Sequence, residues 1–182
     1  LGARLFTDTP VHGIRTAGGR VQGVDTPLGS ISTHHVVNAA GPWAALVGEM
    51  AELCIPVVPV RRQIVVTTPL SQIPPDFPFV IDFAQSLYYH REGEGILTGM
   101  SNPGEPSGFS QAWDQEWELV HLEAAARRMP LLDEAGIQSR WAGLYEVSPD
   151  AHPILGRVPD LDGFYCINGF SGHGFMHGPV CG

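Results

Sequence analysis

The sequence predicts a protein of the α+β class. Short runs of β-branched and aromatic residues recur along the chain, and two segments carry apolar residues at the spacing of an amphipathic helix. The 22 glycines and 16 prolines are frequent for 182 residues of which only 16% are charged. Such a chain turns often, and its 43% apolar content is enough to form a core.

The first third of the chain predicts a β-meander followed by a helix. Residues 11–14, 20–24 and 30–37 are β-branched runs separated by turns that contain glycine. Pro42 suits the first turn of a helix. The helix is predicted by apolar residues at helical spacing, which are Trp43, Leu46, Val47, Met50 and Leu53.

The middle of the chain predicts four strands and the clearest helix. Strands are expected at residues 57–67, 79–83, 86–91 and 95–100. The helix is expected at residues 111–129, with Ser110 as its N-cap and two arginines in its last turn before Pro130. The tryptophans of this helix, Trp113 and Trp117, are expected in the core.

The last segment predicts strands at residues 141–147 and 163–168, and the second of these runs into a glycine-rich turn at residues 169–175. Glycines there allow main-chain N–H groups to face a ligand, and a following helix adds partial positive charge, so the turn could bind an anion. A purely structural turn explains the pattern equally well. The spacing is GxxGxG, which differs from the GxGxxG dinucleotide motif. The same ambiguity applies to residues 38–41.

Charge and composition exclude several functions. The formal net charge of −9 argues against nucleic-acid binding and against an anionic membrane surface. No run of 18 apolar residues is present, so no membrane insertion is expected. Three cysteines without a CxxC pair indicate reduced thiols and a cytoplasmic location.

A metal site is the weaker interpretation of the C-terminal histidines. His173, His177 and Cys181 follow one another at intervals of four residues, which would align them on one face of a helix. Because glycines and Pro179 oppose a regular helix there, no metal is expected. The sequence contains no GxSxG, HExxH or Walker motif, so a hydrolase has no support.

Four motifs in order resemble a known family. They are Val36-Val-Asn-Ala-Ala-Gly-Pro-Trp43, Pro59-Val-Arg-Arg-Gln63, Gly143-Leu-Tyr-Glu-Val-Ser-Pro-Asp150 with Pro153-Ile-Leu-Gly156, and Gly169-Phe-Ser-Gly-His-Gly-Phe175. In this order they resemble the FAD-dependent amine and amino-acid oxidoreductases of the D-amino-acid oxidase superfamily. The branch of sarcosine oxidase, dimethylglycine dehydrogenase and proline dehydrogenase is the most similar.

The resemblance implies how the chain is organised. Residues 1–55 and 144–182 would be parts of an incomplete α/β FAD-binding fold, and residues 56–143 would form a substrate domain with a mixed, largely antiparallel sheet and helices. Family members open with a GxGxxG unit that is not found in this sequence. The chain is therefore expected to be a C-terminal portion of a longer enzyme.

The resemblance also implies a set of cofactor contacts. The main chain of Val11 would meet the adenine end of FAD. Positions that would line the ribityl and pyrophosphate part are Ala40, Gly41 and Trp43. Positions that would lie along the flavin ring are Gly172, His173, Gly174 and Phe175.

Three departures from the family pattern shape the expected chemistry. Gly143 stands where monomeric sarcosine oxidases carry a flavin-linked cysteine, so noncovalent FAD is expected. Met176 replaces a lysine that pairs with the substrate carboxylate. Leu97 replaces a lysine that promotes reaction of reduced flavin with oxygen, and leucine cannot supply that charge. The resemblance thus implies a dehydrogenase rather than an oxidase.

The substrate would be a small amino acid or amine such as sarcosine, dimethylglycine or proline, oxidised at its C–N bond by hydride transfer to FAD. Tyr145, Tyr89 and His90 are the candidates for the substrate side, although buried structural tyrosines are equally expected. Arg61 or Arg62 could orient a carboxylate.

An electron acceptor or partner subunits would complete the reaction, and the chain alone is expected to self-associate. The alternative is a noncatalytic interaction module that binds no FAD in isolation.

Overall fold

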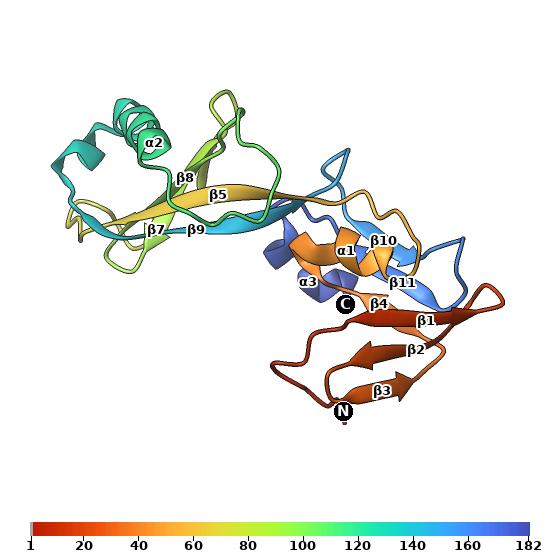
Figure 1. Cartoon of the computed structure of the whole chain (residues 1–182). Helices are drawn as coiled ribbons and strands as arrows, with labels where there is room; N and C mark the ends of the chain where they lie inside the picture. Colours follow the sequence, from red (N-terminus) through yellow and green to blue (C-terminus); the bar gives the residue numbers. More distant parts are fainter. Residues whose placement is uncertain (1) are drawn as a thin grey trace. The chain divides into compact units, whose positions relative to one another are not determined.

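The computed structural model describes residues 2–182, and Figure 1 shows the whole chain. It divides into two compact units. The discontinuous unit consists of the chain up to Pro59 together with Tyr145–Gly182, and the central unit is Val60–Leu144. Strands alternate with a few helices in both units, which confirms the predicted α+β class. The assignment of residues 1–55 and 144–182 to cofactor binding and of 56–143 to substrate binding stays a prediction.

The discontinuous unit contains two three-stranded sheets. The first is an antiparallel meander in the order β1-β2-β3, with strands Gly13–Ala17, Arg20–Thr26 and Gly29–Ser32. The second has the order β10-β11-β4, with strands Ile154–Arg157, Phe164–Asn168 and Val36–Asn38. In it β10 and β11 are antiparallel, whereas β11 and β4 are parallel although they lie far apart in the sequence.

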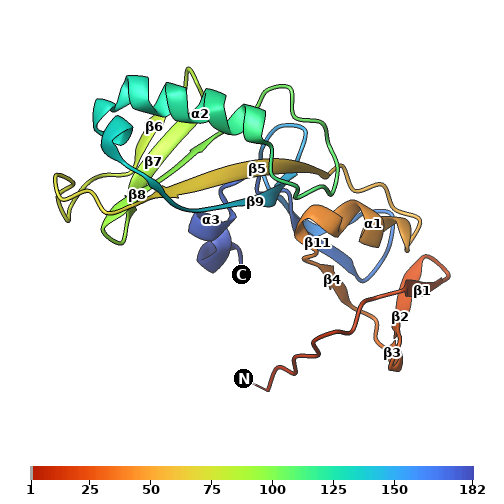
Figure 2. The same cartoon turned by 60° about the vertical axis from the view of Figure 1, so that its left-hand side comes forward.

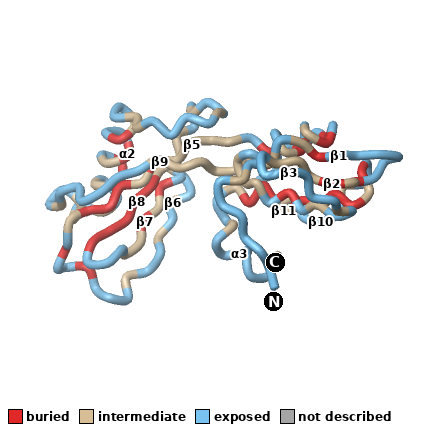
Figure 3. Tube along the Cα trace, turned by 60° about the horizontal axis from the view of Figure 1, so that its bottom comes forward, coloured by how far each residue is buried: buried red, intermediate tan, exposed pale blue. Residues whose placement is uncertain are grey.

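Three short helical segments complete this unit. A 3₁₀ turn, η1 at Gly41–Trp43, leads into helix α1 at Ala44–Glu49, and helix α3 spans Gly174–Cys181. The core lies between the sheets and α1 and is formed by buried apolar residues from both parts of the unit, among them Val21, Ala44, Val57 and Phe164. In contrast, α3 has no buried residue, and Figure 3 shows it as an exposed segment.

The central unit is a five-stranded sheet covered by one helix. The strand order is β6-β7-β8-β5-β9, with strands Val80–Asp82, Leu87–Glu92, Gly95–Met100, Val58–Thr67 and Ile137–Val147. Helix α2 at Gln115–Arg128 lies along one face of this sheet (Figure 2) and is followed by a 3₁₀ helix, η2, at Pro130–Glu134. Leu87, Ile96 and Ala125 are fully buried between helix and sheet.

Buried polar groups join α2 to the sheet. His121 is 1% exposed, and its Nε2 lies 3.0 Å from Oγ1 of Thr98. Burial lowers the pKa of His121 from 6.5 to about 4, although the nearby Glu118 carboxylate acts in the opposite direction. Arg140 donates to both oxygens of Glu118 at 2.9 and 2.8 Å, and the indole of Trp113 donates to Glu118 at 3.1 Å.

The helix expected at residues 111–129 begins later than predicted. Asp114, not Ser110, is the N-cap, because its Oδ1 accepts a hydrogen bond from Trp117 N at 3.0 Å. The preceding residues instead contact β5, where the carbonyl of Ala112 accepts from Arg61. Trp113 therefore precedes the helix, and both tryptophans are only partly buried, contrary to the expected core position.

Two other boundaries also differ from the sequence prediction. The run at residues 30–37 is split into β3 and β4, because β4 leaves the meander to pair with β11. The helix expected to reach Leu53 ends at Glu49. The first difference arises from pairing with a strand distant in the sequence, which local patterns do not contain. Helix α1 instead ends in a local turn, in which Leu53 N donates to the carbonyl of Gly48 and Glu52 has a φ of +58°.

Candidate functional site

The glycine-rich turn after β11 has an unusual main-chain conformation. Three of its residues have positive φ, namely Gly169 (+75°), Ser171 (+53°) and Gly172 (+100°). Helix α3 starts directly afterwards at Gly174, and neither a capping side chain nor an acidic residue occupies its first turn. The first N–H groups of α3 are thus available to an electronegative group.

The end of β9 fastens this turn. The main-chain oxygen of Glu146 accepts from Ser171 N at 3.1 Å, and its Oε2 accepts from Gly169 N at 3.0 Å. The hydroxyl of Ser148 donates to the carbonyl of Gly169 at 3.2 Å, and Ser148 N donates to Oγ of Ser171 at 3.2 Å. Side chains and main chain of one strand end thereby fix the shape of the whole turn.

Tyr145 packs against the same turn. A Cβ atom built on Gly172 would overlap Cε2 of the Tyr145 ring and would lie 2.9 Å from its Cζ. The close approach of ring and main chain therefore requires glycine at position 172. The structure brings together two residues, Tyr145 and Gly172, that the sequence assigned separately to substrate and cofactor.

The second glycine turn lies at the end of β4. Asn38 shapes it, because its Oδ1 accepts from Ala40 N at 3.2 Å and its Nδ2 donates to the carbonyl of Ala44 at 2.9 Å. Gly41 has a φ of +54°, and a Cβ atom built on it would lie 3.9 Å from Oε2 of Glu146. The Glu146 carboxylate thus lies close to both glycine turns.

The remaining predicted cofactor residues differ in their surroundings. The side chain of Phe175 is fully exposed, and Met176 and Trp43 are also exposed. His173 Nδ1 lies 3.3 Å from the carbonyl of Phe170. Val11 packs against the core of the discontinuous unit.

Gly143 stands on β9 within the central unit, with no atom within 4 Å of a built Cβ. Cys54, Cys166 and Cys181 are all free, so none of them forms a disulfide. Within residues 2–182, no group of three His, Cys, Asp or Glu side chains is placed to hold a metal ion.

The central unit places two of the predicted substrate residues on opposite faces of its sheet. Tyr89 is 3% exposed and packs in the core under α2, where its ring stacks on Phe77. Its role as a substrate residue stays a prediction. His90 points to the other face, as strand alternation requires, and its ring stacks on Phe79 at 5.3 Å.

Tyr88 shares the face of His90 and was missed from the sequence. Its ring stacks on Phe79 at 5.8 Å. His90 also pairs directly with Leu97 of β8, so these side chains lie on the sheet face opposite α2. The alternation of β7 would have grouped Tyr88 with His90, but it does not show which face the helix covers.

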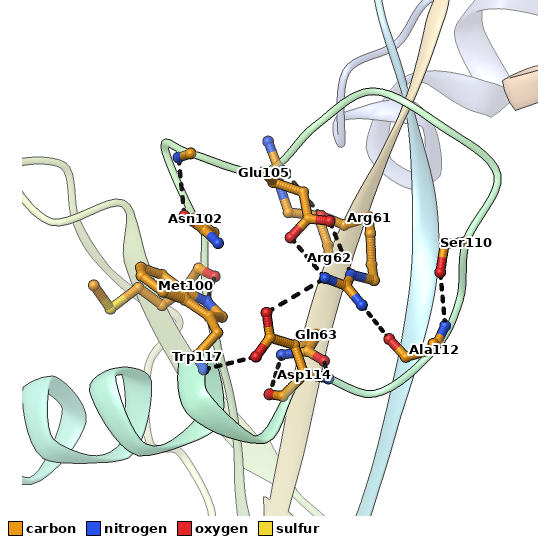
Figure 4. A network of polar contacts seen from close by, with 11 residues as sticks. Arg61, Arg62, Gln63, Met100, Asn102, Glu105, Ser110, Ala112, Asp114 and Trp117 are labelled. Carbon is orange, nitrogen blue, oxygen red and sulfur yellow. Dashed lines mark hydrogen bonds and ion pairs between the residues drawn. The ribbon is translucent and has the colours of Figure 1, made fainter.

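Arg61 is committed to a structural network (Figure 4). Its guanidinium donates to both carboxylate oxygens of Glu105 at 2.9 and 3.2 Å, and it also contacts Asp114 at 3.4 Å. Gln63 donates to the carbonyl of Asp114 at 3.1 Å and accepts from its N–H at 2.6 Å. These contacts fasten the loop before α2 onto β5, so Arg61 is not available to orient a substrate.

Comparisons with known proteins identify the class. The profile of the family described as FAD dependent oxidoreductase (DAO) matches residues 1–182. The chain therefore belongs to this FAD-dependent oxidoreductase family, which confirms the resemblance inferred from the four motifs.

Particular relatives share the whole length of the chain. Human mitochondrial sarcosine dehydrogenase is 36% identical over 196 residues, a match that covers 100% of this chain and 21% of that protein. The crystal structure of L-proline dehydrogenase from P. horikoshii superposes with a TM-score of 0.89 at 33% identity, covering 98% of this chain and 48% of that one. The crystal structure of glycine oxidase from Geobacillus kaustophilus superposes with a TM-score of 0.86 at 25% identity, covering 99% of this chain and 47% of that one. The chain thus spans between a fifth and a half of the proteins that it matches.

The residues of the discontinuous unit fit the cofactor named by the family. FAD combines an anionic pyrophosphate with a flat ring system, and reduction adds negative charge to the ring. The first turns of η1, α1 and α3 contain no acidic residue, and two of these segments adjoin glycines in the left-handed region. Main-chain N–H groups can therefore approach an anionic or oxygen-rich group at both turns.

Proposed function

We propose that the protein to which this chain belongs oxidises the C–N bond of a small secondary or tertiary amino acid, with FAD as the hydride acceptor. The observation that carries the proposal is the match of the entire chain to the FAD-dependent oxidoreductase family, together with the two glycine turns that meet near Glu146. Bound FAD supplies the redox chemistry by accepting a hydride from the carbon next to the substrate nitrogen.

In this proposal the residues of the chain bind the cofactor and orient it. Ala40, Gly41 and Trp43 line the cofactor at the end of β4, and Val11 approaches its adenine end. Gly172, His173, Gly174, Phe175 and Met176 flank the ring, where the start of α3 stabilises negative charge. Gly143 has no side chain that could bond to the flavin, so FAD is bound noncovalently at this position.

Tyr145 of the discontinuous unit is a candidate for the substrate side, and His90 of the central unit stays a separate candidate. Tyr88 joins these candidates because it shares with His90 the sheet face opposite α2. An amino acid that carries a positive nitrogen suits aromatic rings, which attract cations at their faces.

Dehydrogenase activity is favoured over oxidase activity. Leu97, which pairs with His90, and Met176 on α3 are both uncharged at positions where, by the resemblance, monomeric sarcosine oxidases carry lysine. The sarcosine and proline enzymes named above are dehydrogenases by name, although the glycine enzyme is an oxidase. A separate electron acceptor or a partner subunit would reoxidise the flavin.

The cellular location and the self-association of the protein remain predictions. Among the described residues, no helix has the length and apolar character needed to cross a bilayer. A cytoplasmic location rests on the three free cysteines, while the human relative is mitochondrial by name. Self-association rests on the exposed apolar side chains of α3, among them Phe175 and Val180.

The proposal is tested by supplying the intact purified protein with sarcosine, dimethylglycine or proline and an artificial electron acceptor. Reduction of the dye that depends on one of these amino acids supports the proposal. Rapid peroxide formation with oxygen alone would contradict the dehydrogenase assignment. A protein that contains flavin but oxidises none of them would contradict the substrate class.

A further inference from the structure

Glu146 lies between the two glycine turns of the discontinuous unit. One residue of β9 contacts both ends of the 169–171 turn, because its Oε2 accepts from Gly169 N at 3.0 Å and its main-chain oxygen accepts from Ser171 N at 3.1 Å. A Cβ atom on Gly41 would lie 3.9 Å from the same Oε2. The carboxylate therefore holds the 169–171 turn by a hydrogen bond and lies beside the turn at Gly41.

The 169–172 turn needs support from outside itself. Ser171 has a φ of +53°, a conformation that residues with a Cβ disfavour. Such a conformation persists only where its surroundings determine it. The hydrogen bonds that Glu146 accepts from Gly169 N and Ser171 N, together with those that Ser148 donates, provide this constraint.

The carboxylate carries a charge that no side chain neutralises. None of the ion pairs found among residues 2–182 includes Glu146. Its described partner is the N–H of Gly169, and a bond from N–H to an ionised carboxylate is stronger than one to a neutral oxygen. A negative charge beside a bound flavin would also oppose the negative charge that reduction adds to the ring.

We propose that Glu146 is a positioning residue for the cofactor. It holds the 169–172 turn, and through this turn the start of α3, in the conformation that binds FAD. Its charge makes the bound FAD harder to reduce. This inference rests on the proposed function, because it assumes that the two turns bind FAD.

Two substitutions separate the two effects in the intact protein. Glu146→Gln keeps an oxygen that can accept from Gly169 N and removes the charge, whereas Glu146→Ala removes both. Glu49→Ala is the matched control, because Glu49 is an exposed glutamate at the end of α1 in the same unit. FAD affinity, the midpoint potential of bound FAD and amide hydrogen exchange at Gly169 are measured for each variant.

Glu146→Ala is expected to weaken FAD binding by about tenfold or more and to accelerate exchange at Gly169. Glu146→Gln is expected to keep FAD affinity within about threefold and to shift the potential to a more positive value. Glu49→Ala should change none of the three quantities.

Different results would contradict the positioning role of Glu146 and the effect of its charge. Wild-type affinity and exchange in Glu146→Ala would overturn the positioning role. Equal losses of FAD affinity in both Glu146 variants would show that the acceptor oxygen does not determine FAD binding. An unchanged midpoint potential of bound FAD in Glu146→Gln would overturn the effect of the charge. A wild-type protein that binds no FAD would instead contradict the proposed function, and exchange at Gly169 would still report on the contact with Glu146.

Discussion

The ring of Tyr145 occupies the space that a side chain at Gly172 would need. Built Cβ and ring atoms overlap, with the Tyr145 hydroxyl 3.1 Å from the Cβ position. Gly172 also has a φ of +100°, so two independent constraints select glycine there. The contact joins a candidate substrate residue to the turn that would hold the flavin.

Gly172→Ala is expected to destabilise the protein and to displace Tyr145. Strain at positive φ costs about 1–2 kcal/mol, and the overlap adds roughly 1–3 kcal/mol. The measurement is the free energy of unfolding in urea, combined with flavin content.

Gly156→Ala is the matched control for this change. Gly156 has a similar φ of +108° but no atom within 4 Å of a built Cβ, so only the strain should appear. Equal losses of stability in the two variants would contradict the contact with Tyr145. If the contact is present, adding Tyr145→Ala to Gly172→Ala should recover part of the difference.

Arg61→Met is expected to destabilise the central unit by about 3–5 kcal/mol, because it leaves the buried carboxylate of Glu105 without its charged partner. The loop before α2 should also become more sensitive to proteases. Arg127→Met, which removes an exposed pair with Glu123, is the control and should cost about 0.5 kcal/mol or less. Similar effects of both substitutions would argue against the network in Figure 4.

The buried His121 should make stability depend on pH. The pKa of His121 is about 4 in the folded protein, whereas in the unfolded chain it has the ordinary value of 6.5. The unfolded chain therefore binds the proton more tightly. Its contribution is complete above pH 6.5 and is lost as the pH falls toward 4, by up to about 3 kcal/mol. Unfolding in urea at several pH values measures this slope.

His121→Gln removes the titrating group and serves as the comparison. Carboxylates also titrate at low pH. The contribution of His121 is therefore read from the difference in the free energy of unfolding between the wild type and this variant. Between pH 6.5 and 5 the wild type should lose more stability than the variant. Parallel pH profiles would mean that His121 is not buried in its neutral form.

Leu97→Lys is expected to accelerate reoxidation of the reduced flavin by oxygen, because it places a positive charge on the sheet face of His90. Stopped-flow mixing of the reduced intact protein with oxygenated buffer measures the rate. Leu97→Met controls for the change in shape and should leave the rate as in the wild type. Fast reoxidation of the wild type would remove the basis for a dehydrogenase.

Acid precipitation tests noncovalent attachment. With Gly143 at the position of the linked cysteine, flavin should remain in the supernatant after the intact protein is precipitated. Flavin in the washed pellet would contradict this prediction.

Elements governed by local pattern could be predicted from the sequence. Strand β8 has the predicted bounds, residues 95–100, and β11 differs from its predicted bounds by one residue. The late start of α2 could not be predicted, because Arg61 contacts Ala112 from 51 positions away. The same holds for β4, whose parallel partner β11 lies more than 120 residues further along the chain.

The candidate site was only partly visible in the sequence. The glycine turns at Gly41 and Gly172 were found because positive φ favours glycine, and the family match supports their importance. Glu146 was overlooked, since an acidic residue near a strand end carries no local signal of its distant partner Gly169. Tyr88 was not singled out, since alternation alone does not tell which face of β7 is buried.

Anaerobic mixing of the intact protein with sarcosine tests the central claim most directly. The account predicts a visible flavin absorbance that bleaches on mixing with sarcosine, dimethylglycine or proline and returns when an artificial electron acceptor is added. A purified protein without flavin absorbance would favour a noncatalytic module. A flavin that none of these amino acids bleaches would contradict the proposed oxidation of a C–N bond.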